Sequence, residues 1–307
     1  MNNHIYDVVI IGGGPAGYSA ALYTSRAQLD TLVIEQMAPG GQMGLTDIID
    51  NYPGYDEGID GFTLGMKMQS GAERFGAKTI YETVASVDFS QKVKKVFLSN
   101  SVVWAKAVII ATGAEPRELG VEGEKDYIGL GIHYCAHCDG RFYKDKVVAV
   151  VGGGNSAASD ALYLSNLAKK VYLVHRRDKL RATPIYHKPL FKCNNIEFLW
   201  NSTVVGFAAS NRLETMIVEN KITQEKKTIA CDGVFVSIGR KPVTGFLGGC
   251  VELLDGYIVA NESTVTNIRG VFAAGDVRTK ELRQVVTAAS DGATAAHYAQ
   301  EYILSEF

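Results

Sequence analysis

A strand, a glycine-rich turn, a helix and a second strand follow one another twice in this chain, and this repeat limits the possible folds more than any other feature. In the first copy an apolar run over 6–11 leads into Gly12–Gly17, and in the second the run Val147–Val151 leads into Gly152–Ala157. In both copies, 18 positions separate the last small residue of the turn from the polar residue that ends the next strand. The pattern is typical of dinucleotide-binding βαβ units. We therefore expect an α/β fold with two Rossmann-like nucleotide-binding domains of the three-layer ββα type.

The two copies also end alike, which indicates where each domain closes. An apolar strand runs into a Gly-x-x-Pro sequence at Gly113 and again at Gly239. More than sixty residues follow the second closure, with one apolar strand over Gly270–Asp276 and a final helix from about Gln284. Because this tail is too short for an ordinary domain, we expect it to complete the first sheet. The predicted domains are a discontinuous one over 1–113 plus 243–307 and an inserted one over 114–242, joined by two adjacent crossings that form a hinge.

Composition and charge exclude several classes of protein. The length of 307 residues corresponds to about two domains. Thirty-one basic and 33 acidic residues give a formal net charge of −2, which disfavours a nucleic-acid binder with a basic face. No apolar run approaches the ~20 residues of a membrane-spanning helix, and residues 1–4 lack the basic start of a signal peptide. Five sparse cysteines do not make a secreted disulfide framework, so we expect a cytoplasmic protein without membrane or nucleic-acid partners.

The first glycine-rich turn has the spacing and the context of a dinucleotide site. Gly12 permits a tight turn, Gly14 lets the backbone approach a pyrophosphate, and Gly17 allows the helix to pack closely on the strand. The start of the helix then faces the phosphates. Glu35 ends the next strand, where its carboxylate would accept hydrogen bonds from a ribose diol. A tight turn without a ligand is the alternative interpretation.

The second turn differs at the position that contacts the ribose. His175 stands where the first copy has Glu35, and Arg176, Arg177 and Arg181 follow it. A carboxylate would repel a 2′-phosphate, whereas guanidinium groups bind one as planar, permanently charged partners. The cluster therefore predicts NADPH rather than NADH in the second domain. The alternative is an ordinary solvated face, which the position of the cluster at this strand end disfavours.

Cys135 and Cys138 are the only two cysteines that lie close together in the sequence. A structural zinc site normally needs four ligands, and the other three cysteines are scattered. The spacing fits a dithiol that cycles through a disulfide, and no metal site is predicted. Asp139 follows the pair and offers a carboxylate for proton transfer. A turn or helix cap is the other interpretation of Asp139.

Taken together, these motifs resemble those of the low-molecular-weight, bacterial-type thioredoxin reductases, which belong to the FAD- and NADPH-dependent pyridine nucleotide-disulfide oxidoreductases. The resemblance extends over essentially the whole chain, and the order and spacing of the motifs are highly specific. The matching stretches are Gly12–Gly17, Gly40–Gln42, Asn51–Gly54, Ala111–Gly113, Cys135–Gly140, Gly152–Ala157, His175–Arg177 with Arg181, Gly275–Val277 and Arg283–Gln284.

The resemblance implies FAD and NADPH as cofactors, thioredoxin as the protein substrate, and a homodimer. The FAD-binding residues that it implies are Gly12, Gly14, Pro15, Ala16, Gly17, Glu35, Gln36, Gly40, Gly41, Gln42, Asn51, Val84, Thr112, Gly113, Gly275, Asp276, Arg283, Gln284 and Val285. The NADPH-binding residues that it implies are Gly152, Gly154, Asn155, Ser156, Ala157, His175, Arg176, Arg177, Arg181, Ile238 and Gly239. By the same resemblance, Cys138 is the thiol nearest the flavin, Cys135 attacks the partner disulfide, and Asp139 transfers the proton.

The implied order of electron transfer is from NADPH to the flavin, then to the disulfide, and finally to thioredoxin. Both the cysteine pair and the NADPH turn belong to the predicted inserted domain, and both must reach the same flavin. We therefore expect this domain to rotate about its hinge and to present each in turn.

Three features depart from the family pattern. His137 stands where members of the family often have Thr or Val. A histidine at this position is a point of similarity to the flavoprotein subunit of alkyl hydroperoxide reductase. A protonated His137 would stabilise a neighbouring thiolate and make the disulfide more oxidising, unless it is only a solvent-facing turn residue. Ser159 and Asp160 stand where many relatives have paired glutamates, and Leu282 replaces a frequent Tyr. These differences leave the detailed contacts of nicotinamide and flavin open.

Two other functions stay open on the sequence. One is electron supply to a glutaredoxin-like or peroxiredoxin-linked partner. The other is a ferredoxin-fed or regulatory flavoprotein that does not use NADPH, which the arginine cluster disfavours. A monooxygenase or a ferredoxin reductase is disfavoured because neither needs the cysteine pair.

Overall fold

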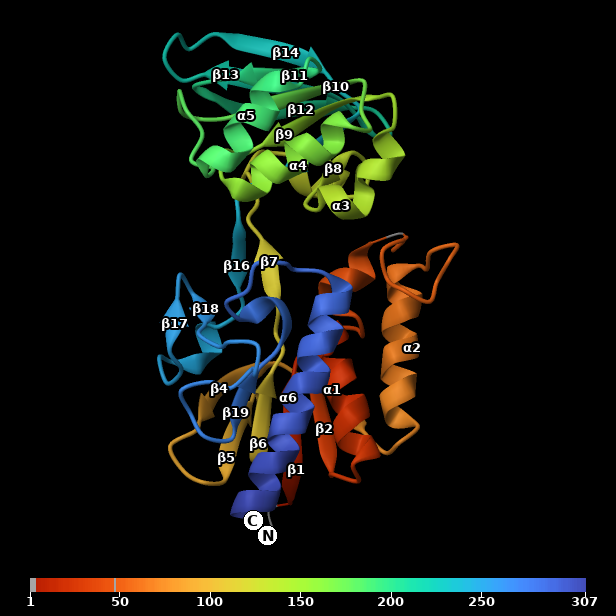
Figure 1. Ribbon diagram of the computed structural model, residues 1–307, viewed down its shortest axis with the longest axis vertical. Helices are drawn as coiled ribbons and strands as arrows, with labels where there is room; N and C mark the ends of the chain where they lie inside the picture. The colour runs from red at the N-terminus through yellow and green to blue at the C-terminus, as the bar shows by residue number, and fades with distance from the viewer. Residues whose placement is uncertain (1–3, 47) are drawn as a thin grey trace. The chain divides into compact units, whose positions relative to one another are not determined.

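The computed structural model describes residues 4–46 and 48–307. These residues form two compact units: unit 1 contains the described residues up to Glu115 together with Lys241–Phe307, and unit 2 contains Pro116–Arg240. The chain therefore leaves unit 1 and returns to it. Strands β7 (Ala114–Pro116) and β16 (Arg240–Pro242), at the two crossings, pair in a two-stranded sheet (Figure 1). The expected lack of a signal peptide rested largely on residues 1–3, which lie outside the described residues.

Unit 1 is built on a seven-stranded sheet with the order β3-β2-β1-β6-β5-β4, in which β19 also pairs with β6. The pairs β1–β2, β1–β6, β2–β3 and β6–β19 are parallel, whereas β4–β5 and β5–β6 are antiparallel. The C-terminal part of the chain thus supplies a strand to the sheet that the N-terminal part begins. The strands are β1 (Ile5–Ile11), β2 (Thr31–Glu35), β3 (Lys78–Tyr81), β4 (Val84–Asp88), β5 (Lys94–Leu98), β6 (Val102–Ile110) and β19 (Val271–Ala273).

Both faces of this sheet are covered, which explains why the last four residues of its central strands, Val8–Ile11 of β1 and Ala107–Ile110 of β6, are all apolar and buried. On β1, Val8 and Ile10 belong to the core on the helical face, whereas Val9 and Ile11 belong to the core on the opposite face. Figure 1 shows three helices side by side on the helical face. They are α1 (Pro15–Arg26), α2 (Gly61–Glu73) and α6 (Val285–Glu306). The short elements of the unit are η1 (Gly41–Leu45), η4 (Gly245–Leu247), η5 (Gly275–Val277), β17 (Leu253–Leu254) and β18 (Tyr257–Ile258).

Unit 2 has a five-stranded parallel sheet with the order β11-β10-β9-β15-β8 and a three-stranded antiparallel sheet, β12-β13-β14. On β9, Val148 and Val150 belong to the core beside α4, and Ala149 and Val151 belong to the core beside the antiparallel sheet. The strands are β8 (Ile132–His133), β9 (Val147–Val151), β10 (Lys170–Val174), β11 (Ile196–Leu199), β12 (Ser202–Ala209), β13 (Leu213–Asn220), β14 (Lys226–Ala230) and β15 (Gly233–Val236). The helices are η2 (Glu124–Tyr127), α3 (Ala136–Asp139), η3 (Gly140–Tyr143), α4 (Asn155–Ser165) and α5 (Pro184–Lys192).

The predicted α/β class with two Rossmann-like folds is confirmed, although one helix end differs from its prediction. The helix after the second turn was expected to reach about 168, but α4 ends at Ser165. The hydroxyl of Ser165 and the amide of Asn166 both donate to the carbonyl of Leu162. Such side-chain bonds to the backbone compete with continued helix.

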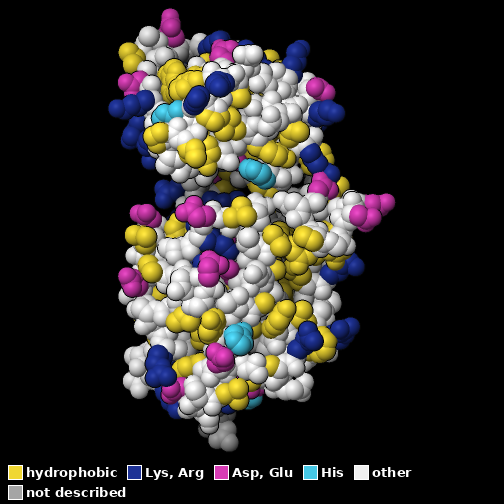
Figure 2. Space-filling view, viewed as in Figure 1, with side chains coloured by type: hydrophobic (Ala, Val, Ile, Leu, Met, Phe, Trp, Pro, Cys, Tyr) yellow, Lys and Arg dark blue, Asp and Glu magenta, His cyan; other side chains and the backbone are white. Residues whose placement is uncertain are grey.

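Two surface properties complete the description of the fold. No helix among the described residues is long and apolar enough to cross a membrane. Figure 2 shows Lys and Arg side chains interspersed with Asp and Glu over the visible surface of both units. This distribution agrees with the formal net charge of −2.

Candidate functional site

The first glycine-rich turn requires glycine for reasons of space. Gly12 has a φ of +106°, and a Cβ on it would lie 2.4 Å from the carbonyl oxygen of Ala111. A Cβ on Gly17 would lie 1.8 Å from the carbonyl oxygen of Gly12. Since heavy atoms cannot approach so closely, a side chain at Gly12 would push the turn away from the end of β6, and one at Gly17 would push α1 away from the turn.

The start of α1 is open and free of a side-chain cap. Gly14 is the N-cap residue and supplies no side-chain hydrogen bond, and Pro15 occupies the first turn. A Cβ on Gly14 would meet nothing closer than the carbonyl oxygen of Gly40, at 3.9 Å. The N–H groups of a first helical turn have no intrahelical partner, so an uncapped helix start can bind a phosphate. These residues therefore fit the pyrophosphate of a dinucleotide.

Glu35 lies at the end of β2, beside the turn. Its Oε2 accepts from the N–H of Gly13 at 2.6 Å, and its Oε1 accepts from the N–H groups of Gln36 and Met37 at 2.8 and 3.1 Å. These bonds hold the carboxylate at the edge of the turn, where the sequence predicts contact with a ribose diol. That contact stays a prediction.

Several predicted FAD residues that are far apart in the sequence meet in unit 1. The N–H of Gly40 donates to the carbonyl of Gly13 at 2.8 Å, and a Cβ on Gly275 would lie 2.9 Å from the Cβ of Ala16. The side-chain amide of Asn51 donates to Oε1 of Gln284 at 2.9 Å. The remaining predicted residues lie on η1 (Gly41, Gln42), at the start of β4 (Val84), after β6 (Thr112, Gly113), on η5 (Asp276) and at the start of α6 (Arg283, Val285).

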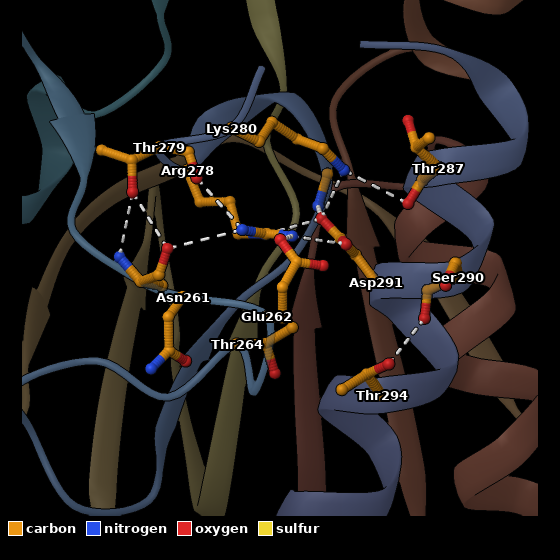
Figure 3. Close-up of polar contacts among 12 residues, drawn as sticks. Asn261, Glu262, Thr264, Arg278, Thr279, Lys280, Thr287, Ser290, Asp291 and Thr294 are labelled. Carbon is orange, nitrogen blue, oxygen red and sulfur yellow. Dashed lines mark hydrogen bonds and ion pairs between the residues drawn. The ribbon is translucent and has the colours of Figure 1, made fainter. Parts of the chain in front are cut away.

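A buried ion cluster that the sequence analysis missed holds the segment that carries Asp276 (Figure 3). Arg278 is 1% exposed, and its Nε and Nη2 donate to the two carboxylate oxygens of Asp291, each at 2.7 Å. Lys280 Nζ and the N–H of Gly275 also donate to Asp291, each at 2.8 Å. Burial would raise the pKa of Asp291, but these donors outweigh it and hold the pKa below its usual value.

The second glycine-rich turn repeats the geometry of the first. Gly152 has a φ of +154°, and a Cβ on it would lie 2.3 Å from the carbonyl oxygen of Ser237. Gly154 is the N-cap residue of α4 and provides no side-chain bond. A Cβ on Gly154 would meet nothing closer than the guanidinium of Arg181, at 4.0 Å. The N–H of Arg181 donates to the carbonyl of Gly153 at 2.7 Å, which fixes this cation beside the turn.

His175 has a different role from the arginines that follow it. It is 4% exposed, and a Cβ on Gly153 would lie 2.2 Å from its ring, so the imidazole packs directly against the turn. Burial and the positive charges of Arg181, Arg177 and Arg176 lower its pKa, which favours the neutral ring. The three arginines are exposed and are therefore accessible to a phosphate. Contact of His175 with NADPH stays a prediction.

The other predicted NADPH residues surround the second turn. The N–H of Thr183 donates to Oδ1 of Asn155 at 2.8 Å, so Asn155 ties the start of α4 to the start of α5. Ser156 and Ala157 continue α4. Ile238 and Gly239 follow β15, and Gly239 has a φ of +108°. The residues of the second turn thus fit a dinucleotide that carries a 2′-phosphate.

Cys135 and Cys138 form a disulfide at the start of the short helix α3. Both cysteines are partly exposed. The N–H groups of Cys138 and Asp139 point to the carbonyl of Cys135, at 3.3 and 3.1 Å. Asp139 Oδ2 lies 3.1 Å from Nδ1 of His133, a buried residue that the sequence analysis overlooked. The only sequence feature that could have pointed to His133 was its position, two residues before Cys135.

His137 is exposed, as a solvent-facing residue would be, and its ring also has two defined contacts. Its ring stacks on Tyr163 with a centroid distance of 4.4 Å, and its Nδ1 lies 3.6 Å from Oδ1 of Asp160. The hydroxyl of Ser237 donates to the other carboxylate oxygen of Asp160. Asp160, which departs from the family pattern, is therefore the carboxylate that faces His137. The influence of His137 on the redox potential stays a prediction.

The remaining cysteines are free thiols and lie away from the disulfide in sequence. Burial raises the pKa of Cys231 to about 12 and also raises the pKa of Cys250, so both thiols stay protonated and unreactive near neutral pH. Cys193 is partly exposed. Within residues 4–46 and 48–307, no group of three or more potential metal ligands gathers.

Comparisons with known proteins agree with this geometry. Residues 6–292 match the family model described as pyridine nucleotide-disulphide oxidoreductase. The chain is 48% identical to a thioredoxin reductase of Listeria monocytogenes and 46% identical to one of Bacillus subtilis, over 97% of this chain and 94% and 95% of theirs. A solved thioredoxin reductase structure from Streptococcus pyogenes is 44% identical, with a TM-score of 0.91 and coverage of 99% of this chain and 100% of that one.

Proposed function

Because the chain belongs to the pyridine nucleotide-disulphide oxidoreductase family, we propose that it is an NADPH-dependent thioredoxin-disulfide reductase. The cofactors are FAD and NADPH. The observation that carries the proposal is the disulfide between Cys135 and Cys138, which lies in the same unit as a nucleotide turn with three exposed arginines. A chain with a reversible disulfide and a 2′-phosphate site can pass electrons from NADPH to a protein disulfide.

Each unit of the protein takes one cofactor in this proposal. In unit 1, the start of α1 would hold the pyrophosphate of FAD, and the carboxylate of Glu35 would hold its ribose. NADPH binds unit 2, with its pyrophosphate at the start of α4 and its 2′-phosphate on Arg176, Arg177 and Arg181. Bound FAD would supply the redox group that links NADPH to the disulfide.

The protein residues then control thiols and protons. Cys138 receives the electrons, Cys135 attacks the disulfide of thioredoxin, and Asp139 moves a proton to or from the thiol that forms. The cysteines and the NADPH turn share unit 2, whereas the FAD residues belong to unit 1. We therefore propose that unit 2 turns about the β7 and β16 crossings between the two half-reactions.

Two further properties complete the proposal. We propose a homodimer, on the resemblance to the thioredoxin reductases. We also propose a cytoplasmic location, because three of the five cysteines are free thiols, which suits a reducing compartment.

Steady-state rates with purified oxidised thioredoxin test the function directly. The holoenzyme should oxidise NADPH in proportion to the thioredoxin that it reduces, and NADH should replace NADPH poorly. Parallel assays with a glutaredoxin and a peroxiredoxin as acceptors separate the other enzyme functions. Turnover with either of these but not with thioredoxin would contradict the proposal. An enzyme whose flavin is not bleached by NADPH under anaerobic conditions would also contradict it.

Replacing Arg177 and Arg181 with alanine should change the nucleotide preference. Each guanidinium forms a charge-assisted bond to the 2′-phosphate, so we expect the KM for NADPH to rise about 10- to 100-fold while the KM for NADH stays nearly constant. Lys188→Ala is the matched control, because it removes an exposed cation from α5. A double variant that keeps the wild-type KM for NADPH would refute the assignment of the arginine cluster.

A further inference from the structure

A buried row of polar side chains connects Asp139 with the interior of unit 2. His133, at the end of β8, is 8% exposed and lies between two partners. Its Nδ1 is 3.1 Å from Oδ2 of Asp139, and its Nε2 is 2.6 Å from the hydroxyl of Tyr143. The imidazole also stacks on Phe235 of β15, with a centroid distance of 5.3 Å. We call the three residues Asp139, His133 and Tyr143 the His133 relay.

The phenol of the relay keeps its proton throughout the working range of pH. Burial raises the pKa of Tyr143 to about 12, with Arg212 opposing this shift and Asp139 and Asp232 adding to it. Lys146 Nζ lies 5.5 Å from the centroid of the Tyr143 ring. Because a neutral hydroxyl both donates and accepts, Tyr143 can bond to Nε2 of His133 whether or not that nitrogen carries a proton.

The relay therefore has two consistent arrangements of protons. When Asp139 is a carboxylate, the proton of the neutral imidazole belongs on Nδ1, facing the carboxylate, and the Tyr143 hydroxyl donates to Nε2. When Asp139 is protonated, its acid proton faces the lone pair of Nδ1, and Nε2–H donates to the Tyr143 oxygen. One change of tautomer at His133 thus suits both charge states of Asp139.

We propose that His133 is a positioning residue that lets Asp139 cycle between its two protonation states during disulfide reduction. The inference rests on the proposed function. Reduction breaks the Cys135–Cys138 bond with two electrons and one proton from NADPH and one proton from water, and gives two thiols. The later reaction with a partner disulfide re-forms the Cys135–Cys138 bond, and both electrons and both protons leave with the partner thiols. Asp139 carries one proton in each direction, and the change of tautomer at His133 accompanies each transfer.

Nuclear magnetic resonance of the holoenzyme labelled with ¹⁵N-histidine tests the relay directly. The chain has six histidines, and the spectrum of His133→Asn assigns the signals of His133 by their loss. We expect the shifts of Nδ1 and Nε2 to exchange their protonated and unprotonated values as the pH is changed, and to stay fixed in Asp139→Asn. A single tautomer of His133 at every pH in the wild type would overturn the proposal.

The pH dependence of turnover gives a second readout. The double variant His133→Phe/Tyr143→Phe keeps the ring packing on Phe235 and leaves no phenol without a partner. Its kcat with thioredoxin should fall about 10- to 100-fold, and the pH at half-maximal kcat should differ from that of the wild type, because Asp139 loses the imidazole that faces it. Tyr134→Phe is the control, since the Tyr134 hydroxyl donates to Glu124 at 2.8 Å instead. A lower kcat with an unshifted pH profile would mean only a structural role and would overturn the inference.

Failure of the proposed function and failure of the His133 relay would give different results. If the wild type does not reduce thioredoxin, the proposed function fails, but the ¹⁵N shifts still show whether the His133 tautomer follows Asp139. If the wild type turns over normally and its His133 shifts do not respond to Asp139, only the relay fails.

Discussion

Replacing Cys138 with serine should lower the rate of thioredoxin reduction by about 10³-fold or more, while FAD binding and reduction of the flavin by NADPH remain intact. A serine hydroxyl cannot form the disulfide that accepts the electrons, so the second half-reaction has no acceptor. The glycine turns and the arginines, which lie elsewhere in the sequence, are unchanged. Anaerobic stopped-flow absorbance measures the bleaching of the flavin by NADPH, and a coupled thiol assay measures the reduction of thioredoxin.

The matched control is Cys193→Ser, which changes the same atom in a partly exposed free thiol. Cys193 contacts the hydroxyl of Ser165 and the carbonyl of Pro189, and neither residue belongs to the predicted site. This variant should reduce thioredoxin at nearly the wild-type rate. If Cys138→Ser still turned over with thioredoxin, the electrons would have to bypass the disulfide, and the proposed function would be wrong.

The parallel strands and the glycine turns could be predicted because local sequence determines them. The second half of β1 and most of β9 are buried on both faces, so they appear as short apolar runs rich in valine and isoleucine. No side chain fits at Gly12, Gly17 or Gly152, because neighbouring backbone atoms lie too close. This requirement for glycine explains the fixed spacing of the turns. The antiparallel sheet β12-β13-β14 was not predicted, because its half-exposed strands mix polar with apolar residues and have no such motif.

The contacts that support the site could not be read from the sequence for a different reason. His133 stands close to the cysteines in the sequence, but its burial depends on β8 pairing with β15, about one hundred residues away. Asp291 is a single acidic residue in a stretch of α6 rich in small residues. Its partner Arg278 lies on the preceding loop and could equally have pointed to solvent. Local patterns thus locate the cofactor turns, whereas the residues that hold them in place depend on tertiary packing.

Replacing Asp291 with asparagine should destabilise unit 1 by about 3–5 kcal/mol, because Lys280 would lose its carboxylate and Arg278 would keep only the exposed Glu262. The side chains of Arg278 and Lys280 are 1% and 6% exposed. Asp291 also accepts from the N–H of Gly275, the residue before Asp276, so the variant should release FAD more readily. Urea unfolding of the holoenzyme, followed by circular dichroism and by the fluorescence of released flavin, measures both effects.

The pH dependence of this loss of stability distinguishes the contribution of the Asp291 charge from that of side-chain packing. The pKa of Asp291 is lower in the folded protein than its ordinary value of about 3.9. The carboxylate therefore contributes its full stability above about pH 4 and loses it as the pH falls through the lower folded pKa. The difference in stability between the wild type and Asp291→Asn should accordingly shrink below about pH 4. A difference that stays constant across this range would mean that packing, and not the ion pair, is responsible.

Two further variants test whether the buried charges of the cluster account for the loss of stability. Glu262 also bonds to Arg278, at 3.2 Å, but its side chain is 92% exposed, so Glu262→Gln should cost less than about 1 kcal/mol. The triple variant Arg278→Met/Lys280→Met/Asp291→Leu removes the three buried charges together and should recover most of the lost stability, because apolar side chains carry no desolvation penalty. If Asp291→Asn were within about 1 kcal/mol of the wild type at pH 7, the cluster would not stabilise unit 1. The segment that carries Asp276 would then have to be held by its apolar neighbours alone.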